Sequence, residues 1–118
     1  MVGGISIHVM DVVQGCPAQG MKVEVFTVGE TPQRIAAGEL SDKGTLEHPV
    51  AQGQDVVEGV YEAMFYIGAF YRQRGDPLPE LPFLDVVPFR FGISDVAQHY
   101  HLPMKVSPWG FSLFRGGA

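Results

Sequence analysis

The chain has 118 residues, of which 46% are hydrophobic and 18% are charged, so it is long and apolar enough to form one domain, 1–118, with its own core. Its formal net charge of −5 excludes a nucleic-acid partner, because phosphate binding needs clustered Lys and Arg, and the eight present are scattered. Cys16 is the one cysteine, which excludes an intrachain disulfide and favours a reducing compartment. We recognise no targeting segment and no apolar stretch of membrane-spanning length, so we expect a cytoplasmic protein with no membrane partner.

The first half of the chain predicts strands separated by turns. Ile5, Ile7 and Val9 are apolar and alternate with Ser6 and His8, which is the period of a half-buried strand whose histidine points away from the core. The other elements predicted here are a loop over 11–20, strands over 21–28 and 34–40, a turn over 41–44 and a short fourth strand over 45–47.

The second half predicts further strands and one short helix. Residues 67–74 are followed by Gly75, a common residue at the end of a helix, so a helix is expected there. Pro88 interrupts a strand pattern over 83–93, which indicates an edge strand or a bulge. The remaining predictions are strands over 56–66, 97–106 and 111–115, a proline-rich connector over 77–82 and a hairpin turn over 107–110. Many short strands and one helix, without βαβ alternation, predict an all-β fold, a β-sandwich.

Two histidines near the C-terminus, His99 and His101, lie two residues apart in a predicted strand. Side chains alternate across a strand, so both project from the face opposite Tyr100 and Leu102, and His101 faces outward as His8 does. Outward histidines can be ordinary solvated surface, and that alternative stays open.

Metal binding and serine catalysis are the other chemistries that these residues raise. His99 and His101 could chelate an ion, but no cysteine or second histidine pair completes a zinc ligand set, so we expect no metal. The available serines do not lie in a nucleophile-elbow sequence, which argues against a Ser-His-Asp triad. These serines are Ser6, Ser94, Ser107 and Ser112.

Four separated segments of the chain resemble the transthyretin-like 5-hydroxyisourate hydrolases. The C-terminal segment reads His-Tyr-His-Leu-Pro over 99–103, then Ser-Pro-Trp-Gly-Phe-Ser over 107–112 and Phe-Arg-Gly-Gly over 114–117. The family typically ends His-Tyr-His-Val-Pro, Ser-Pro-x-Gly-Tyr-Ser and Tyr-Arg-Gly-Ser. The other three segments are 6–18, 57–61 and 82–91, and they resemble the family in order and spacing.

The resemblance implies a transthyretin-like sandwich of two four-stranded sheets with one short helix, assembled as a homotetramer, a dimer of dimers. It also implies hydrolytic opening of the six-membered ring of 5-hydroxyisourate, in urate degradation, at sites between the dimers and without a cofactor. The family's two catalytic histidines fall on His8 and His101, and an imidazole of ordinary pKa can accept a proton from water at neutral pH. The substrate-binding residues implied are Thr45, Ser112, Phe114, Arg115 and Gly116.

The chain also departs from the family at polar positions of the site. Thr45 stands where the family has an arginine, Phe114 replaces a tyrosine, and Gly117 replaces the terminal serine. A guanidinium clamps planar acceptors with two hydrogen bonds, and a threonine offers one hydroxyl instead. Two alternatives therefore stay open: a paralogue that hydrolyses another cyclic amide or imide, and a non-catalytic protein that binds small molecules as transthyretin does.

Overall fold

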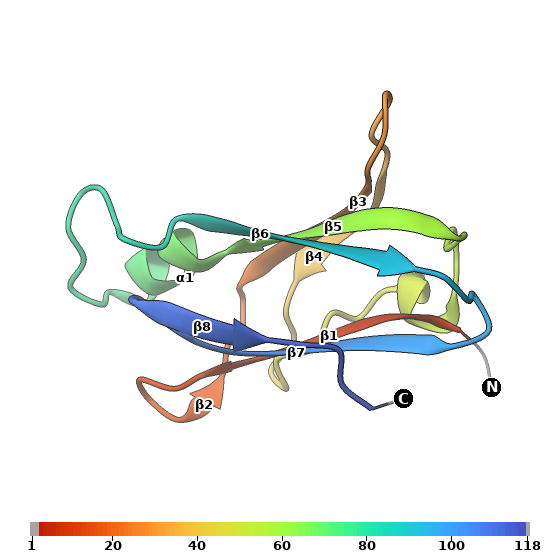
Figure 1. Ribbon diagram of the computed structural model, residues 1–118. Helices are drawn as coiled ribbons and strands as arrows, with labels where there is room; N and C mark the ends of the chain where they lie inside the picture. The colour runs from red at the N-terminus through yellow and green to blue at the C-terminus, as the bar shows by residue number, and fades with distance from the viewer. Residues whose placement is uncertain (1–2, 118) are drawn as a thin grey trace.

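Two four-stranded sheets pack face to face in the computed structural model, which describes residues 3–117 (Figure 1). The first sheet has the order β2-β1-β7-β8 and the second has the order β4-β3-β5-β6. The strands of the first sheet are β1 (Gly4–Asp11), β2 (Cys16–Pro17), β7 (His99–Ser107) and β8 (Gly110–Leu113), and those of the second are β3 (Lys22–Thr27), β4 (Arg34–Glu39), β5 (Gly59–Tyr66) and β6 (Val86–Ile93). The predicted all-β sandwich with a short helix is confirmed.

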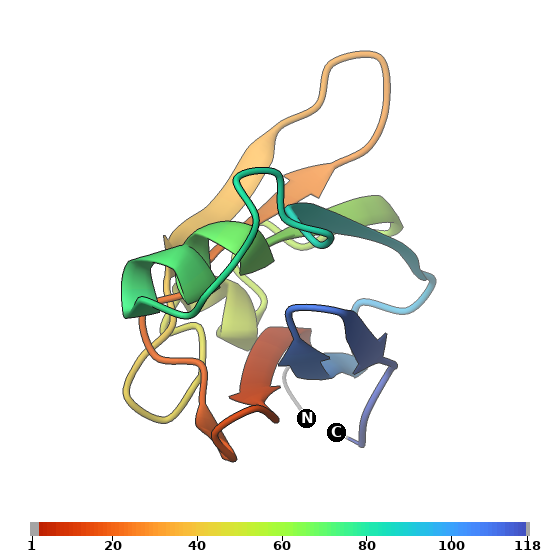
Figure 2. The same cartoon turned by 90° about the vertical axis from the view of Figure 1, so that its left-hand side faces the viewer.

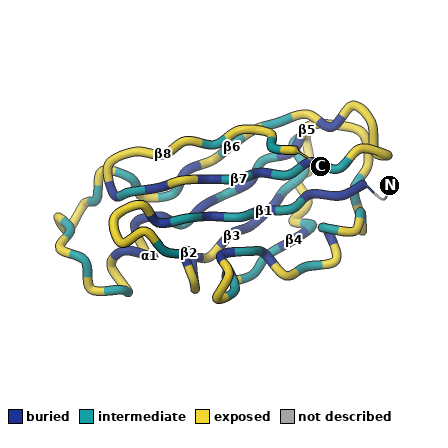
Figure 3. Tube along the Cα trace, turned by 90° about the horizontal axis from the view of Figure 1, so that it is seen from below, coloured by how far each residue is buried: buried dark blue, intermediate teal, exposed yellow. Residues whose placement is uncertain are grey.

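The core lies between the sheets, and it is built by the alternation that the sequence predicts. Ile5, Ile7 and Val9 of β1 are buried against the second sheet, while the residues between them are half-buried on the outer face. Tyr100, Leu102, Met104 and Val106 do the same in β7. Figure 3 shows this alternation of buried and partly exposed positions along both strands. The outer face of the first sheet is therefore free to carry polar side chains.

Helix α1 (Ile67–Arg74) follows β5 directly and covers one end of the sandwich (Figure 2). It ends as predicted at Gly75, which has a φ of 91° and whose N–H donates to the carbonyl groups of Tyr71 and Arg72. Only glycine adopts this left-handed conformation at little cost. In the part of the chain that the structure describes, no helix is long and apolar enough to cross a membrane.

Pro88 lies in β6, which is an edge strand of the second sheet. A proline has no N–H to donate to a neighbouring strand, and an edge strand has one side without a neighbour, so the predicted edge position is confirmed.

The predicted strand over 45–47 is wrong. Thr45 forms only an isolated bridge with His8, and the chain then turns into a 3-10 helix, Pro49–Gln52. Pro49 fixes the backbone for the first helical turn, and the Val50 N–H donates to the His48 side chain, so the chain leaves the strand conformation. The fourth strand of the first sheet is instead the two-residue β2, which lies within the predicted loop.

A buried carboxylate, Asp11, joins the end of β1 to α1 and to β7. The Tyr71 hydroxyl lies 2.6 Å from Asp11 Oδ1 and 3.0 Å from the Val106 carbonyl oxygen, and Arg74 Nη1 lies 2.6 Å from Asp11 Oδ2. Burial raises the pKa of Asp11, but the hydrogen bonds from Tyr71, Arg74 and two backbone N–H groups together bring it below its ordinary value. The ionised carboxylate is therefore a stabilising part of the fold.

Replacing Tyr71 with phenylalanine should lower the free energy of unfolding by about 2 kcal/mol at neutral pH, because the ring is kept while a hydrogen bond to a charged group is lost. The pKa of Asp11 is lower in the folded state, so its contribution is present above the ordinary carboxyl range and is lost as the pH falls. The difference in unfolding free energy between wild type and Tyr71→Phe, measured by urea denaturation, should therefore shrink as the pH falls below the ordinary carboxyl range.

The matched control is Tyr61→Phe, since Tyr61 is equally buried but its hydroxyl bonds only to the backbone of Val57. Its destabilisation should not change as carboxylates become protonated. An equal pH response in both variants would contradict the role given to Asp11.

Candidate functional site

The parallel pairing of β1 with β7 places His8 and His101 on one face. Ser6 pairs with His101 and His8 pairs with Pro103, so the two histidines are diagonal neighbours on adjacent strands. Both are half-buried on the outer face, as the sequence predicts. Two imidazoles from opposite ends of the chain thus meet on a single sheet surface.

His101 is held at one ring nitrogen by the serine of the neighbouring strand. Ser6 Oγ lies 2.6 Å from His101 Nδ1 and 2.7 Å from His99 Nε2. The other nitrogen of His101, Nε2, forms no hydrogen bond with residues 3–117 and is not enclosed by them. This nitrogen is available to a ligand or to water. The sequence suggests Ser6 only as a candidate nucleophile, and the alternation of β1 places it on the outward face with His8; its contacts with His99 and His101 come from the pairing of β1 with β7.

The environment of His101 favours the neutral imidazole. Partial burial lowers its pKa, and the nearby His8 and His99 rings lower it further, because a second positive charge beside them is unfavourable. A neutral imidazole with one free nitrogen can accept a proton near neutral pH.

Thr45 lies beside His8, since the two residues form an antiparallel bridge. The Val9 N–H donates to the Gly44 carbonyl and the Leu46 N–H donates to the Ile7 carbonyl, which fixes the segment against β1. The Thr45 hydroxyl lies 2.9 Å from Ser41 Oγ and donates to Glu47 Oε1 at 2.9 Å. Thr45 is therefore placed at the histidine surface with its hydroxyl already engaged.

The C-terminal tail extends the register of β8 along β7. Met104 pairs with Leu113, and an isolated bridge pairs His101 with Gly116, whose N–H donates to the His101 carbonyl at 2.7 Å. Phe114 is thus on the outer side with His101 and is 57% exposed. A β-carbon on Gly116 would lie 3.0 Å from His101 Cδ2, so glycine is what lets the tail approach the imidazole this closely.

Ser112 and Arg115 lie apart from this group. Ser112 pairs with Lys105, four residues beyond His101 along β7, which is about 13 Å at the usual rise of a strand. The Arg115 guanidinium lies 4.0 Å from the centre of the Tyr100 ring and donates to Gln98 Oε1, on the inner side of the strand. The structure therefore brings together His8, His101, Thr45, Phe114 and Gly116, and it places Arg115 on the opposite face of the strand.

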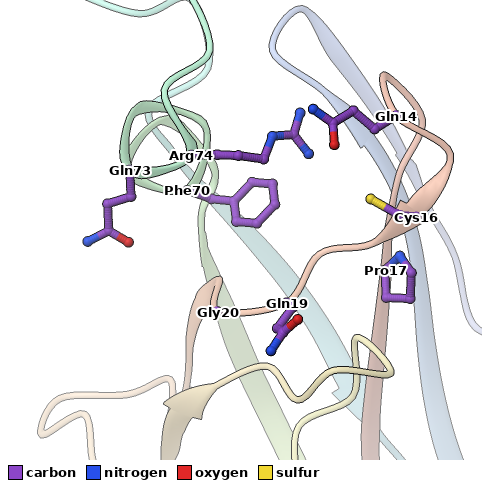
Figure 4. Close-up of a pocket in the computed structure, with 8 residues that line it drawn as sticks. All are labelled: Gln14, Cys16, Pro17, Gln19, Gly20, Phe70, Gln73 and Arg74. Carbon is purple, nitrogen blue, oxygen red and sulfur yellow. The ribbon is translucent and has the colours of Figure 1, made fainter.

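The hollows of the described structure lie away from these histidines. A cavity of about 340 Å³ opens between α1 and the segment that follows β1 (Figure 4). Arg74 on its wall is paired with Asp11 and Asp76, which leaves no uncompensated charge for a ligand. Two further hollows involve the second sheet and Arg115, and neither His8 nor His101 lines any of the three. Among residues 3–117 no group of three His, Cys, Asp or Glu side chains is arranged to hold a metal ion.

The protein is thus a two-sheet β-sandwich with His8, His99 and His101 on the outer face of one sheet. The chain belongs to the HIUase/Transthyretin family, whose model matches residues 5–116. It is 42% identical over 116 residues to a 5-hydroxyisourate hydrolase of Pseudomonas aeruginosa, a match that covers 98% of this chain and 92% of the relative.

Two solved structures have the same fold. An (S)-allantoin synthase superposes with a TM-score of 0.89 at 36% identity, and the match covers 98% of this chain but only 44% of that longer chain. A sea bream transthyretin in complex with thyroxine superposes with a TM-score of 0.84 at 23% identity, covering 97% of this chain and 95% of the other. The second likeness shows the fold alone.

The close approach of the tail to His101 can be tested without a substrate. Gly116→Ala should push the tail from the imidazole, and the amide of residue 116 should lose protection against hydrogen exchange by about tenfold, the equivalent of one hydrogen bond. The His101 ring resonances should shift in the same NMR spectra. Gly117→Ala is the matched control, since a β-carbon there meets no atom within 4 Å. Equal effects of the two substitutions would contradict this placement of the tail.

Proposed function

We propose that this protein is a hydrolase that opens the ring of 5-hydroxyisourate in urate degradation. The observation that carries the proposal is the 42% identity, over nearly the whole of both chains, to a protein named 5-hydroxyisourate hydrolase. The presence of His8 and His101 on one outward surface supports it, since the family resemblance places the two catalytic histidines at these positions and imidazoles can transfer protons.

His101 acts as the general base in this proposal. Its Nε2 takes a proton from a water molecule as the water oxygen attacks the ring carbonyl, and the carbon–nitrogen bond of the ring then breaks. The proton passes to the departing nitrogen, so the reaction consumes one water and needs no oxidant or reductant. His8, diagonal to His101, orients the substrate or donates to the developing oxyanion. The lowered pKa of His101 supports its role as the base.

The substrate lies against the outer face in this proposal, between Thr45 on one side and Phe114 with Gly116 on the other. Phe114 offers a ring to stack on a planar substrate but lacks the hydroxyl that the family's tyrosine carries. Ser112 and Arg115 complete the predicted binding set. Both lie away from His101 within one subunit. In this proposal a second subunit contributes them to the bound substrate, or the Arg115 side chain rotates from the inner face to the outer face.

We propose further that the chain assembles as a homotetramer with its sites between dimers. The histidine surface of one protomer is open, and β8 is an edge strand with unpaired backbone groups. Exposed large apolar side chains at the end of the same sheet support self-association, namely Val12, Val13, Trp109 and Phe111. We place this assembly in the cytoplasm, where Cys16, the free cysteine, stays reduced.

The main test follows the ultraviolet absorbance of 5-hydroxyisourate generated from urate in situ. Wild type should accelerate its decay, and His8→Ala and His101→Ala should each lower the rate by about 10²–10⁴, the usual worth of general acid–base catalysis. Lys105→Ala, on the same face of β7 but away from the histidines, is the control and should keep the wild-type rate. The activity is refuted if wild type gives no acceleration, and the histidine mechanism is refuted if both variants stay fully active.

The polar substitutions in the site generate a second test. Thr45→Arg combined with Phe114→Tyr should raise kcat/KM for 5-hydroxyisourate several-fold, because the guanidinium and the phenol add donors for planar acceptors. A fall in kcat/KM would instead favour the alternative that this site is specialised for another cyclic amide.

A further inference from the structure

The Ser6 hydroxyl is the centre of a three-residue array behind the free nitrogen of His101. It lies within hydrogen-bond distance of one nitrogen on each of two rings, at 2.6 Å from His101 Nδ1 and 2.7 Å from His99 Nε2. The array lies on the outer face of the two central strands of the first sheet, and it runs from β1 to two positions of β7. His99 Nδ1, at its far end, forms no hydrogen bond with residues 3–117 and is not enclosed by them.

Counting protons leaves two arrangements when both imidazoles are neutral. A hydroxyl donates one hydrogen bond, so it donates to one ring and accepts from the other. In the first arrangement His101 Nδ1–H donates to Ser6, and Ser6 donates to His99 Nε2, which leaves His101 Nε2 bare. In the second every donor is reversed, and His101 carries its proton on Nε2. Only the first arrangement has a base directed to the open face.

The first arrangement becomes the second when one proton enters at His101 Nε2, two protons shift along the array through Ser6 and one proton leaves at His99 Nδ1, and no heavy atom has to move. We propose that Ser6 and His99 form a proton relay behind His101, which holds His101 in the Nδ1–H tautomer and receives a proton from it during hydrolysis. This inference rests on the proposed function and assigns roles to two residues that do not touch the substrate. Ser6 and His99 are positioning residues in this scheme, and His101 remains the group that meets the water.

The steps of the relay balance. His101 Nε2 takes a proton from the attacking water, its Nδ1 proton passes to Ser6 Oγ, and the Ser6 hydroxyl proton passes to His99 Nε2. His99 then carries the positive charge and His101 is neutral, with its proton on Nε2. When that proton is given to the departing nitrogen, the His99 Nε2 proton returns to Ser6 Oγ and the Ser6 hydroxyl proton returns to His101 Nδ1, which restores the first arrangement. No charge accumulates on the half-buried ring next to His8.

Few titratable or charged groups lie near His101, so a titration of its ring can be interpreted. His8 lies on β1, His99 lies on β7, and the tail contributes Gly116, which carries no charge. Glu47 accepts from Thr45 near His8, and Lys105 lies four residues along β7. His8 and His99 are the charges that act on the pKa of His101.

The decisive measurement is the tautomer of His101, read from the nitrogen chemical shifts of its ring in wild type, Ser6→Ala and Ser6→Thr without substrate. Wild type should show the Nδ1–H form, Ser6→Ala should show a mixture of both tautomers, and Ser6→Thr, which keeps the hydroxyl, should restore the Nδ1–H form. An unchanged tautomer in Ser6→Ala overturns the proposal. Because this readout needs no turnover, it decides the relay even if 5-hydroxyisourate is not the substrate.

Kinetics supply the second arm. Ser6→Ala and His99→Ala should each lower kcat by about 10–100-fold with little change in KM, and the double variant should be no slower than the slower single variant, as expected for residues that act as a unit. Ser6→Thr should recover most of the rate. Ser107→Ala removes a hydroxyl from the same face at the other end of β7 and should keep the wild-type rate. Losses that add fully in the double variant overturn the relay.

Discussion

The parallel pairing of β1 with β7 is the constraint on which the rest of the structure depends. It joins positions more than 90 residues apart in the chain, as the separation of Ser6 from His99 and His101 shows. Closing so long a loop costs conformational entropy, which the apolar faces of both strands offset by burial against the second sheet. A slip of β7 by one residue would turn His99 and His101 toward the core, so burial of the inner face of β7 also fixes which residues it carries on the outer face.

The same pairing is held at its far end by a buried polar group. Asp11 pairs with Val106 in the register of the two strands, and the Tyr71 hydroxyl contacts both residues. Helix α1 thereby acts on the alignment of β1 with β7, although it lies at the opposite end of the strands from Ser6 and His99. The fold and the site are connected through this alignment, because a change in register at Asp11 would also change the pairing of Ser6 with His101 at the other end of the same strands.

Much of this could be predicted from the sequence, because alternation and turn residues are local signals. The outward faces of His8 and His101, the helix ending at Gly75 and the edge position of Pro88 all follow from patterns within a few residues. The bonds of Ser6 could not be predicted, since they depend on the register between two strands distant in sequence. The placement of Arg115 had a signal, because a residue next to outward Phe114 in an extended chain faces inward. The predicted strand at Thr45 is absent because the segment forms only one bridge to β1, and Pro49 then starts a 3-10 helix.

The backbone contact between Gly116 and His101 has a practical consequence for handling the protein. Because the Gly116 N–H donates to the His101 carbonyl, bulk or charge attached to the tail close to Gly116 would be imposed directly on the imidazole surface. Affinity handles or fluorophores are better inserted in the loop between β3 and β4, which projects away from the first sheet (Figure 1). A protein tagged at the tail would therefore differ in turnover from one tagged in this loop, even if both fold equally well.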